Sequence, residues 1–204
     1  MLARKPASER KAEIVDTTLR LADEVGPDRL TTQAVANAVG LTQPAIFRHF
    51  ATKQDLWMAV ATTISERLKA VWEDALQASD DPKTRIEALI LGQLHQIEAM
   101  PAIPSILFSR ELQVENNALR LSVLDLMSQL VALLTRELTI GQRLGVFDPD
   151  LPPKDGAFLL IALVQGLAIR WTLGKRDLGM DAEGRRLLAA QMRLFQLAQK
   201  EGKS

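Results

Sequence analysis

The sequence of 204 residues predicts an all-α protein of about nine helices. Aromatic residues make up only 4% of the chain and tyrosine is absent, whereas the helix-favouring residues Leu, Ala, Gln, Arg and Glu are abundant. Apolar residues recur along most of the chain at the three- and four-residue spacing of an amphipathic helix. Clusters of Gly and Pro separate these periodic segments and predict the loops between the helices.

The composition is that of a globular protein and excludes several kinds of site. Hydrophobic residues make up 47% of the chain and charged residues 25%, which favours a packed core over disorder. The absence of cysteine excludes a disulfide framework, a thiolate nucleophile and cysteine-bound zinc. No apolar segment follows the basic N-terminus, so no secretory signal is expected. These features predict a cytoplasmic protein.

Neither hydropathy nor net charge indicates a membrane protein or a general nucleic-acid coat. The most apolar stretch, residues 157–169, is interrupted by Gln165 and is shorter than the roughly 20 residues that span a bilayer. The formal net charge is zero, which argues against indiscriminate binding to nucleic acid. Residues 1–53 nevertheless hold eight basic and six acidic side chains, a slight positive excess at the N-terminus.

Residues 8–25 predict the first helix, because apolar residues recur on one face as far as Val25. Ser8 is expected to be the N-cap of this helix. Gly26 and Pro27 are expected to end it.

Two short helices joined by a tight turn are predicted next. Thr31 is expected to cap the first of them, over residues 32–39, and Gly40 to end it in the left-handed conformation that glycine adopts without strain. Thr42 is expected to cap the second, which has Pro44 near its start. Two short helices with a glycine-containing turn of three or four residues are typical of a helix-turn-helix motif. The second helix would be the reading helix.

The reading helix is expected to bury Ile46, Phe47 and Phe50. Beyond it, apolar periodicity predicts six longer helices, and Pro101 with Pro104 is expected to force a break before the third of these. The six helices are predicted over residues 53–77, 83–99, 105–114, 117–141, 154–173 and 182–200.

The segment from Thr31 to Lys53, TTQAVANAVGLTQPAIFRHFATK, closely resembles the DNA-binding module of the tetracycline-repressor (TetR) family. The resemblance extends over about the first 60 residues, and it fixes the cap, the turn glycine, the reading helix and the trailing lysine together. The rest of the chain resembles the family only in outline. The resemblance implies a helix-turn-helix DNA-binding domain over residues 1–53 and a larger helical domain over residues 54–204 that binds an effector and forms a homodimer.

The resemblance also implies how this module contacts double-stranded DNA. Gln43 can make a paired donor and acceptor contact to adenine or another base edge, and most of the specificity is expected there. Thr31, Thr42 and the helix N-termini can donate to phosphate oxygens. The implied contact residues are Thr31, Thr32, Gln33, Thr42, Gln43, Pro44, Ala45, Arg48, His49 and Lys53.

The remaining contact residues have different implied partners. Pro44 and Ala45 offer small apolar surface to a thymine methyl group, and Arg48 can reach a guanine or a phosphate. His49 and Lys53 match positions of the family that usually hold phosphates, although His49 can equally be a half-buried core histidine. Thr31 and Thr42 would serve as helix caps even in a protein that never met DNA.

Two further N-terminal features have competing interpretations. Phe47 stands where the family usually has a tyrosine whose hydroxyl contacts a phosphate, so Phe47 is interpreted as a core residue. Four basic residues can form a salt-sensitive arm on DNA or simply be solvated charge. They are Arg4, Lys5, Arg10 and Lys11.

The helix predicted over residues 154–173 is apolar nearly all round, so one covered face cannot hide its apolar side chains. We expect this helix and the one over residues 182–200 to form a self-complementary four-helix interface in a homodimer. Burial inside one large domain is the alternative. The interface is predicted to contain Phe158, Ile161, Ala162, Gln165, Ile169, Leu188, Met192 and Phe195.

By resemblance, the helices between residues 53 and 141 enclose a pocket for a small effector. The residues predicted to line it are mostly apolar with a few polar groups, as is usual for small-molecule sites. They are Trp72, His95, Glu98, Met100, Phe108, Met127 and Trp171, and each can instead be a core residue. His95 lies in sequence among Leu91, Leu94 and Ile97, so it is expected to need a polar partner.

These features together predict a sequence-specific transcription regulator, a repressor that leaves a near-palindromic operator when a small apolar effector binds. An enzyme is not expected, because the chain has only two histidines, no cysteine, no phosphate-binding glycine loop and no metal-ligand spacing. No cofactor or metal is predicted. An architectural DNA protein would need a basic balance or apolar wedges. A dimeric small-molecule carrier with a vestigial helix-turn-helix remains the third alternative.

Overall fold

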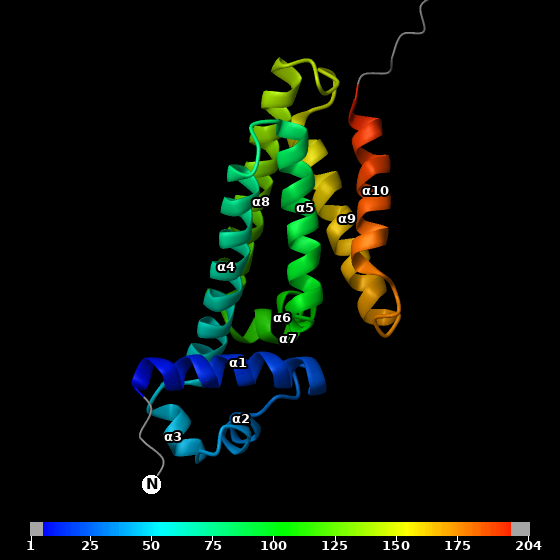
Figure 1. Cartoon of the computed structure of the whole chain (residues 1–204). Helices are drawn as coiled ribbons and strands as arrows, with labels where there is room; N and C mark the ends of the chain where they lie inside the picture. Colours follow the sequence, from blue (N-terminus) through cyan, green and yellow to red (C-terminus); the bar gives the residue numbers. More distant parts are fainter. Residues whose placement is uncertain (1–5, 197–204) are drawn as a thin grey trace, which may run out of the picture. The chain divides into compact units, whose positions relative to one another are not determined.

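A computed structural model describes residues 6–196 of the chain and shows ten helices and no strand in that range. The predicted all-α fold is therefore confirmed (Figure 1). The helices are α1 Ala7–Val25, α2 Thr32–Ala38, α3 Gln43–Phe47, α4 Lys53–Gln77, α5 Pro82–Ala99, α6 Ala102–Leu107, α7 Arg110–Glu115, α8 Asn117–Arg143, α9 Pro153–Leu173 and α10 Met180–Phe195.

The helices group into two compact units. The first unit contains the described residues up to 67 together with residues 100–125, and the second contains residues 68–99 and 126–196. Because α4 and α8 each contribute residues to both units, neither unit is a single continuous stretch of chain.

In the first unit, α1 packs against α2 and α6, and α2 packs against α3 (Figure 1). The buried side of α1 includes Ile14 and Leu19, with less than a tenth of either side chain exposed. The Ser109 hydroxyl, which precedes α7, donates to the carboxylate of Asp28 in the loop after α1. This hydrogen bond ties the α6–α7 segment to the loop that leads into α2.

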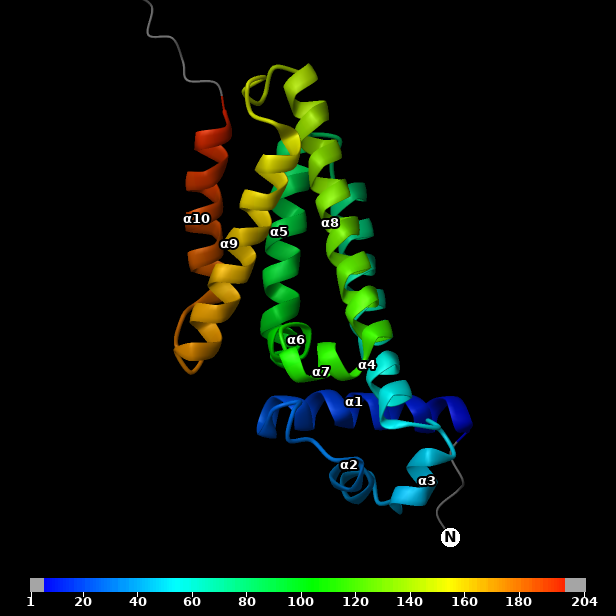
Figure 2. The same ribbon diagram turned by 180° about the vertical axis from the view of Figure 1, so that it is seen from behind.

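In the second unit, α5, α9 and α10 pack against one another, as both views show (Figures 1 and 2). The α5–α10 contact is close at Gly184, where an added Cβ would lie 2.4 Å from the Cδ1 of Leu94. The Trp72 indole N–H donates to the Gln93 side-chain oxygen at 3.0 Å, so this buried polar pair is satisfied.

Some helix boundaries differ from those predicted. The helix expected over residues 105–114 is two short helices, α6 and α7, because Ser109 adopts an extended conformation and caps α7 by accepting from the Leu112 N–H. Pro101 precedes α6 and Pro104 lies in its first turn, where a missing N–H costs nothing. The predicted cap Ser8 lies inside α1, which starts after Pro6. The end predicted at residue 200 lies outside the described residues.

Helix α9 is longer than the apolar stretch of residues 157–169, whose short length was the reason for not expecting a membrane-spanning helix. It has 21 residues, and by length and composition alone α8 and α9 are both long and apolar enough to cross a membrane. Core helices of soluble proteins meet the same criterion. One face of α9, which includes Leu160, Val164 and Leu167, is buried in the second unit.

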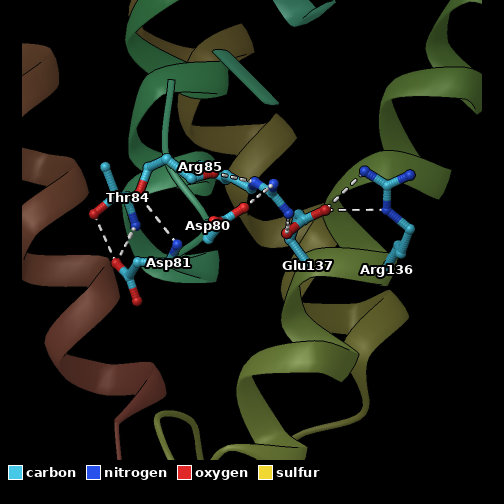
Figure 3. Close-up of polar contacts among 7 residues, drawn as sticks. Asp80, Asp81, Thr84, Arg85, Arg136 and Glu137 are labelled. Carbon is cyan, nitrogen blue, oxygen red and sulfur yellow. Dashed lines mark hydrogen bonds and ion pairs between the residues drawn. The ribbon is translucent and has the colours of Figure 1, made fainter. Parts of the chain in front are cut away.

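The second unit also buries a carboxylate among arginines (Figure 3). Glu137 of α8 is fully buried, and its Oε1 accepts from Nε and Nη2 of Arg136 at 3.0 and 2.8 Å. Nη1 of Arg85, on α5, lies 3.6 Å from the other carboxylate oxygen. Arg85 also donates to Asp80, at 3.2 Å. This network links α5 to α8.

The residue that precedes α5 is itself a helix cap. The Asp81 carboxylate accepts from the hydroxyl of Thr84 at 2.6 Å and from its N–H at 2.8 Å. These two hydrogen bonds, the hydroxyl bond first, lower the pKa of Asp81 below its usual value. The capped turn holds the start of α5 beside the buried carboxylate network (Figure 3).

We predict that the arginines matter more than the buried carboxylate for the stability of the second unit. Arg136→Met should lower the free energy of unfolding by about 1–3 kcal/mol, because it leaves Glu137 buried without its hydrogen bonds. Glu137→Met should cost less than about 1 kcal/mol, because both arginines are partly exposed and can be hydrated. Urea denaturation of the two variants measures this, and a larger loss for Glu137→Met would contradict it.

Candidate nucleic-acid interface

The turn between α2 and α3 is built on Gly40. Its φ of +67° is in the left-handed region, as predicted. Gly40 N–H donates to the Asn37 carbonyl at 3.2 Å, and Leu41 N–H donates to the Ala36 carbonyl at 2.9 Å. These bonds close the C-terminus of α2 and reverse the chain within two residues, so that α3 starts at a fixed angle to α2.

The caps of these two helices are only partly as predicted. Thr31 caps α2, since its hydroxyl accepts from the Ala34 N–H at 3.1 Å. Thr42 occupies the extended N-cap position of α3 but makes no capping hydrogen bond with its side chain. Its exposed hydroxyl is therefore not engaged in capping α3. Pro44 lies in the first turn of α3, as predicted.

The first turn of α3 is tied to the first turn of α2 by a side-chain hydrogen bond. Gln43 donates from Nε2 to the hydroxyl of Thr32 at 2.7 Å. Thr32 is 8% exposed, and Gln43 is half-buried. Pro44 and Arg48 are exposed, whereas Ala45 is half-buried.

The buried side of α3 is narrower than predicted. Ile46 and Phe50 are buried, with 1% and 6% of each residue exposed, but Phe47 is 40% exposed. The interpretation of Phe47 as a core residue is wrong, because successive helical residues differ by about 100° and a five-residue helix buries only one stripe. His49 is half-buried.

Helix α4 starts with a capping box that was not predicted from the sequence. The Thr52 N–H donates to Asp55 Oδ2 at 3.0 Å, and the Asp55 N–H donates to Thr52 Oγ1 at 3.0 Å. The Thr-x-x-Asp spacing before an apolar run was the signal that could have predicted it. The capping box fixes the first turn of α4, where Lys53 is the first helical residue.

The predicted basic arm is partly engaged within the protein. Arg10 pairs with Glu13 at 2.7 Å, and the Lys11 ammonium lies 5.7 Å from the centre of the Phe50 ring. Arg4 and Lys5 lie outside the described residues. Gln33 is exposed on α2, and its Nε2 donates to Asn37 at 2.7 Å.

Residues 14–60 match the family model of the bacterial regulatory proteins of the tetR family. This part of the chain is a DNA-binding domain of the TetR family. The matched range covers most of α1, the whole helix-turn-helix and the capped start of α4.

Solved structures with the same fold cover nearly the whole chain. KstR2 of Mycobacterium tuberculosis, a ketosteroid transcriptional regulator, has a TM-score of 0.78 and 19% identity, over 93% of this chain and 96% of that one. FadR of Bacillus subtilis in complex with stearoyl-CoA has a TM-score of 0.75 and 14% identity, over 89% and 97%. AibR in complex with isovaleryl coenzyme A and operator DNA has a TM-score of 0.76 and 18% identity, over 89% and 97%.

Curated relatives include nucleoid occlusion factors called SlmA. The SlmA of Haemophilus ducreyi is 24% identical over 123 residues, which are 60% of this chain and 61% of that protein. The chain thus spans less than two thirds of this relative's length. The SlmA of Marinobacter nauticus is 25% identical over 166 residues, 81% of this chain and 84% of that protein.

The residues predicted to line an effector pocket lie in different environments. Trp72 and Trp171 are buried in the second unit. His95 is exposed, so water can satisfy its ring and the expected polar partner is not needed. Glu98 is also exposed, and Phe108 is 45% exposed. Met100 and Met127 are half-buried.

One cleft in the first unit is lined by other residues. It has a volume of about 420 Å³ and lies between α1 and the first half of α4. Its walls include Lys11, Asp16, Phe50 and Arg67, and none of the seven residues predicted to bind an effector lines it. Among residues 6–196 no cluster of three potential metal ligands occurs.

The residues predicted for the dimer interface divide into two sets. Phe158, Ala162 and Ile169 are exposed on α9, and Ile161 and Gln165 are half-buried there. Three others face the core of the second unit itself, with at most 2% of each residue exposed. These three, Leu188, Met192 and Phe195, are not on the surface that α10 presents. Leu194, which the prediction omitted, is 78% exposed on α10.

We predict that removing the capping box loosens the start of α4. Asp55→Ala should lower the free energy of unfolding by about 0.5–2 kcal/mol and speed hydrogen exchange of the amides in the first turn of α4. Asp74→Ala, which removes an exposed carboxylate from the other half of the helix, is the control and should leave these amides unchanged. Equal exchange rates in both variants would show that the capping box does not hold this turn.

Proposed function

We propose that this TetR-family regulator is a homodimeric repressor that binds a near-palindromic operator and leaves it when a small, largely apolar effector binds. The observation that supports this most strongly is the short helix α3 after the Gly40 turn, where Thr32 holds Gln43 in the first turn and Arg48 is exposed at the C-terminal end. A short helix with a carboxamide in its first turn and an exposed guanidinium at its end suits the major groove. We place the protein in the cytoplasm, where operator DNA is accessible.

The proposed DNA contacts are of two kinds: contacts to bases, which recognise the sequence, and contacts to phosphates, which position the protein on the duplex. Gln43 and Arg48 would contact base edges, while Pro44 and Ala45 would contact a thymine methyl group. Lys53 would bind a phosphate at the start of α4, where the helix dipole also favours an anion. The same phosphate-positioning role is proposed for Thr31, Gln33, Thr42 and His49.

Because three of the residues first predicted for the dimer interface are buried, we place the proposed interface on the exposed apolar residues of α9 and α10 instead. Phe158, Ile169, Leu173 and Leu194 are each about half exposed or more. An exposed apolar surface of this kind marks an interaction site more often than a free surface. Dimerisation would place two reading helices roughly 34–36 Å apart, one turn of DNA. We assign DNA binding to residues 1–53, and effector binding and dimerisation to residues 54–204.

We infer that the apolar part of the effector is an acyl chain, so acyl thioesters of coenzyme A are the first compounds to test. Two proteins of the same fold hold such ligands, stearoyl-CoA in one and isovaleryl coenzyme A in the other. A ligand alters DNA affinity only if it binds one arrangement of the reading helices more tightly than the other. Helix α4 is the proposed lever, because it starts beside the reading helix and continues into the second unit.

The decisive experiment is selection from a random duplex library at near-physiological salt. The proposal expects enrichment of a near-palindrome with half-sites about one turn apart, followed by its release on addition of an acyl-CoA but not of free coenzyme A. Absence of any enriched sequence would contradict sequence-specific binding and favour a ligand carrier with a vestigial helix-turn-helix.

A second candidate function is that of a nucleoid occlusion factor, which the names of the curated relatives favour. Mapping of bound chromosomal sites in cells separates the two candidates. A repressor should occupy one or a few sites beside promoters, whereas a factor that acts on the nucleoid should occupy many sites spread along the chromosome.

We predict that Gln43→Ala lowers sequence-specific binding by about 1–3 kcal/mol and leaves binding to random duplex unchanged. The carboxamide contacts a base edge in this proposal, so only the specific complex loses it. Lys53→Ala, a phosphate contact, should weaken both complexes and reduce the salt dependence. Fluorescence anisotropy with operator and random duplexes measures both variants, and an equal loss on the two duplexes by Gln43→Ala would contradict a reading role.

We predict that Phe158→Glu converts the dimer to monomer at concentrations where the wild type is dimeric. The variant would place a charge in an apolar interface, and removing that charge from water is costly even with Lys154 nearby, whose ammonium lies 6.0 Å from the centre of the Phe158 ring. Leu144→Glu is the matched control, because Leu144 is 65% exposed but lies outside the proposed interface. Sedimentation velocity distinguishes the states, and a dimeric Phe158→Glu variant would place the interface elsewhere.

A further inference from the structure

Thr32 differs from the other threonines of the helix-turn-helix. Thr31 and Thr42 are exposed, whereas Thr32 is buried, with 8% of the residue exposed. A buried hydroxyl in this position is poorly placed to reach a phosphate. The hydroxyl instead accepts the hydrogen bond from Gln43 at 2.7 Å.

From this geometry we infer that Thr32 is a positioning residue for sequence reading: it holds the Gln43 carboxamide in its reading orientation before DNA arrives. The inference rests on the proposed function, because it concerns how Gln43 discriminates between bases. It assigns to Thr32 an indirect role in place of a direct DNA contact.

The chemistry of a primary amide gives this hydrogen bond a directional consequence. The carboxamide of Gln43 has two N–H donors and one carbonyl acceptor. One donor is used by Thr32. The second donor and the carbonyl oxygen, presented on one edge, form the pair that matches adenine N7 and N6. Thr32 thereby fixes which edge of the amide faces the groove.

The same hydrogen bond reduces the entropy lost on binding. A glutamine side chain has three rotatable bonds, and in an exposed residue all three are free. In this chain Gln43 is half-buried and anchored at its tip, so less freedom remains to be lost when the base contact forms. The anchor connects the first residue of α3 to the first residue of α2, two helices that the Gly40 turn already holds together.

The test uses the full-length protein and the operator found by selection, with each base pair of a half-site replaced in turn. Gln43→Ala identifies the base pair that Gln43 reads. At that base pair, Thr32→Val should reduce discrimination between the correct and the replaced base by about 3- to 10-fold, the range of one lost hydrogen bond. Val has the size of Thr but no hydroxyl. Thr32→Ser, which keeps the hydroxyl, should retain most of the discrimination.

Two controls separate positioning from folding. In the Gln43→Ala background, Thr32→Val should have no further effect on discrimination, because the residue on which it acts is gone. Thr139→Val removes a threonine hydroxyl that bonds within α8 in the second unit, and it should leave discrimination at every base pair unchanged. An equal loss by Thr32→Val in the presence and absence of Gln43 would overturn the inference.

A measurement on the unmodified protein covers the case in which Thr32→Val fails to fold. Nitrogen-15 relaxation of the Gln43 side-chain amide, without DNA, should give an order parameter well above that of the exposed Gln54 side chain. Equal mobility of the two amides would overturn the inference. Failure of the selection to enrich any sequence would instead contradict the proposed function, so the two failures are distinguishable.

Discussion

The left-handed turn at Gly40 is the constraint on which the recognition surface depends. A residue with a Cβ would be strained at this φ, so the turn fixes both the end of α2 and the point where α3 begins. Once α3 is placed, Ile46 and Phe50 anchor its inner side and Gln43 reaches back to Thr32. A helix of only five residues would have little stability alone, so its orientation comes from these tertiary contacts.

The second unit follows a different physical rule, in which one apolar stripe of each helix is covered by its neighbours. Helix α9 is covered on the side of Leu160 and Val164 and presents Phe158 and Ile169 to solvent. A buried carboxylate, Glu137, interrupts this apolar packing and is held by arginines from its own helix and from α5. Such a network specifies one register of helix packing more strictly than apolar contacts do.

The sequence was sufficient for the fold class and for the α2–α3 turn, because glycine, threonine caps and helical periodicity act locally. The sequence was insufficient to predict whether an apolar residue is buried, because burial depends on which neighbouring helix covers that residue. Phe47 and Leu188 are both apolar, but only Leu188 is buried in the chain's own core. The hydrogen bond between Gln43 and Thr32 joins residues eleven positions apart and depends on the angle between two helices, so periodicity carried no signal for it.

The central claim, that two copies of this helix-turn-helix read DNA together, is tested most directly by changing the spacing of the half-sites. Binding is measured to the selected operator and to a version with about five base pairs inserted at its centre, which turns one half-site to the opposite side of the duplex. The account predicts that the insertion lowers affinity to the level of random duplex. Undiminished affinity for the altered operator would mean that each protomer binds alone, and would contradict the account.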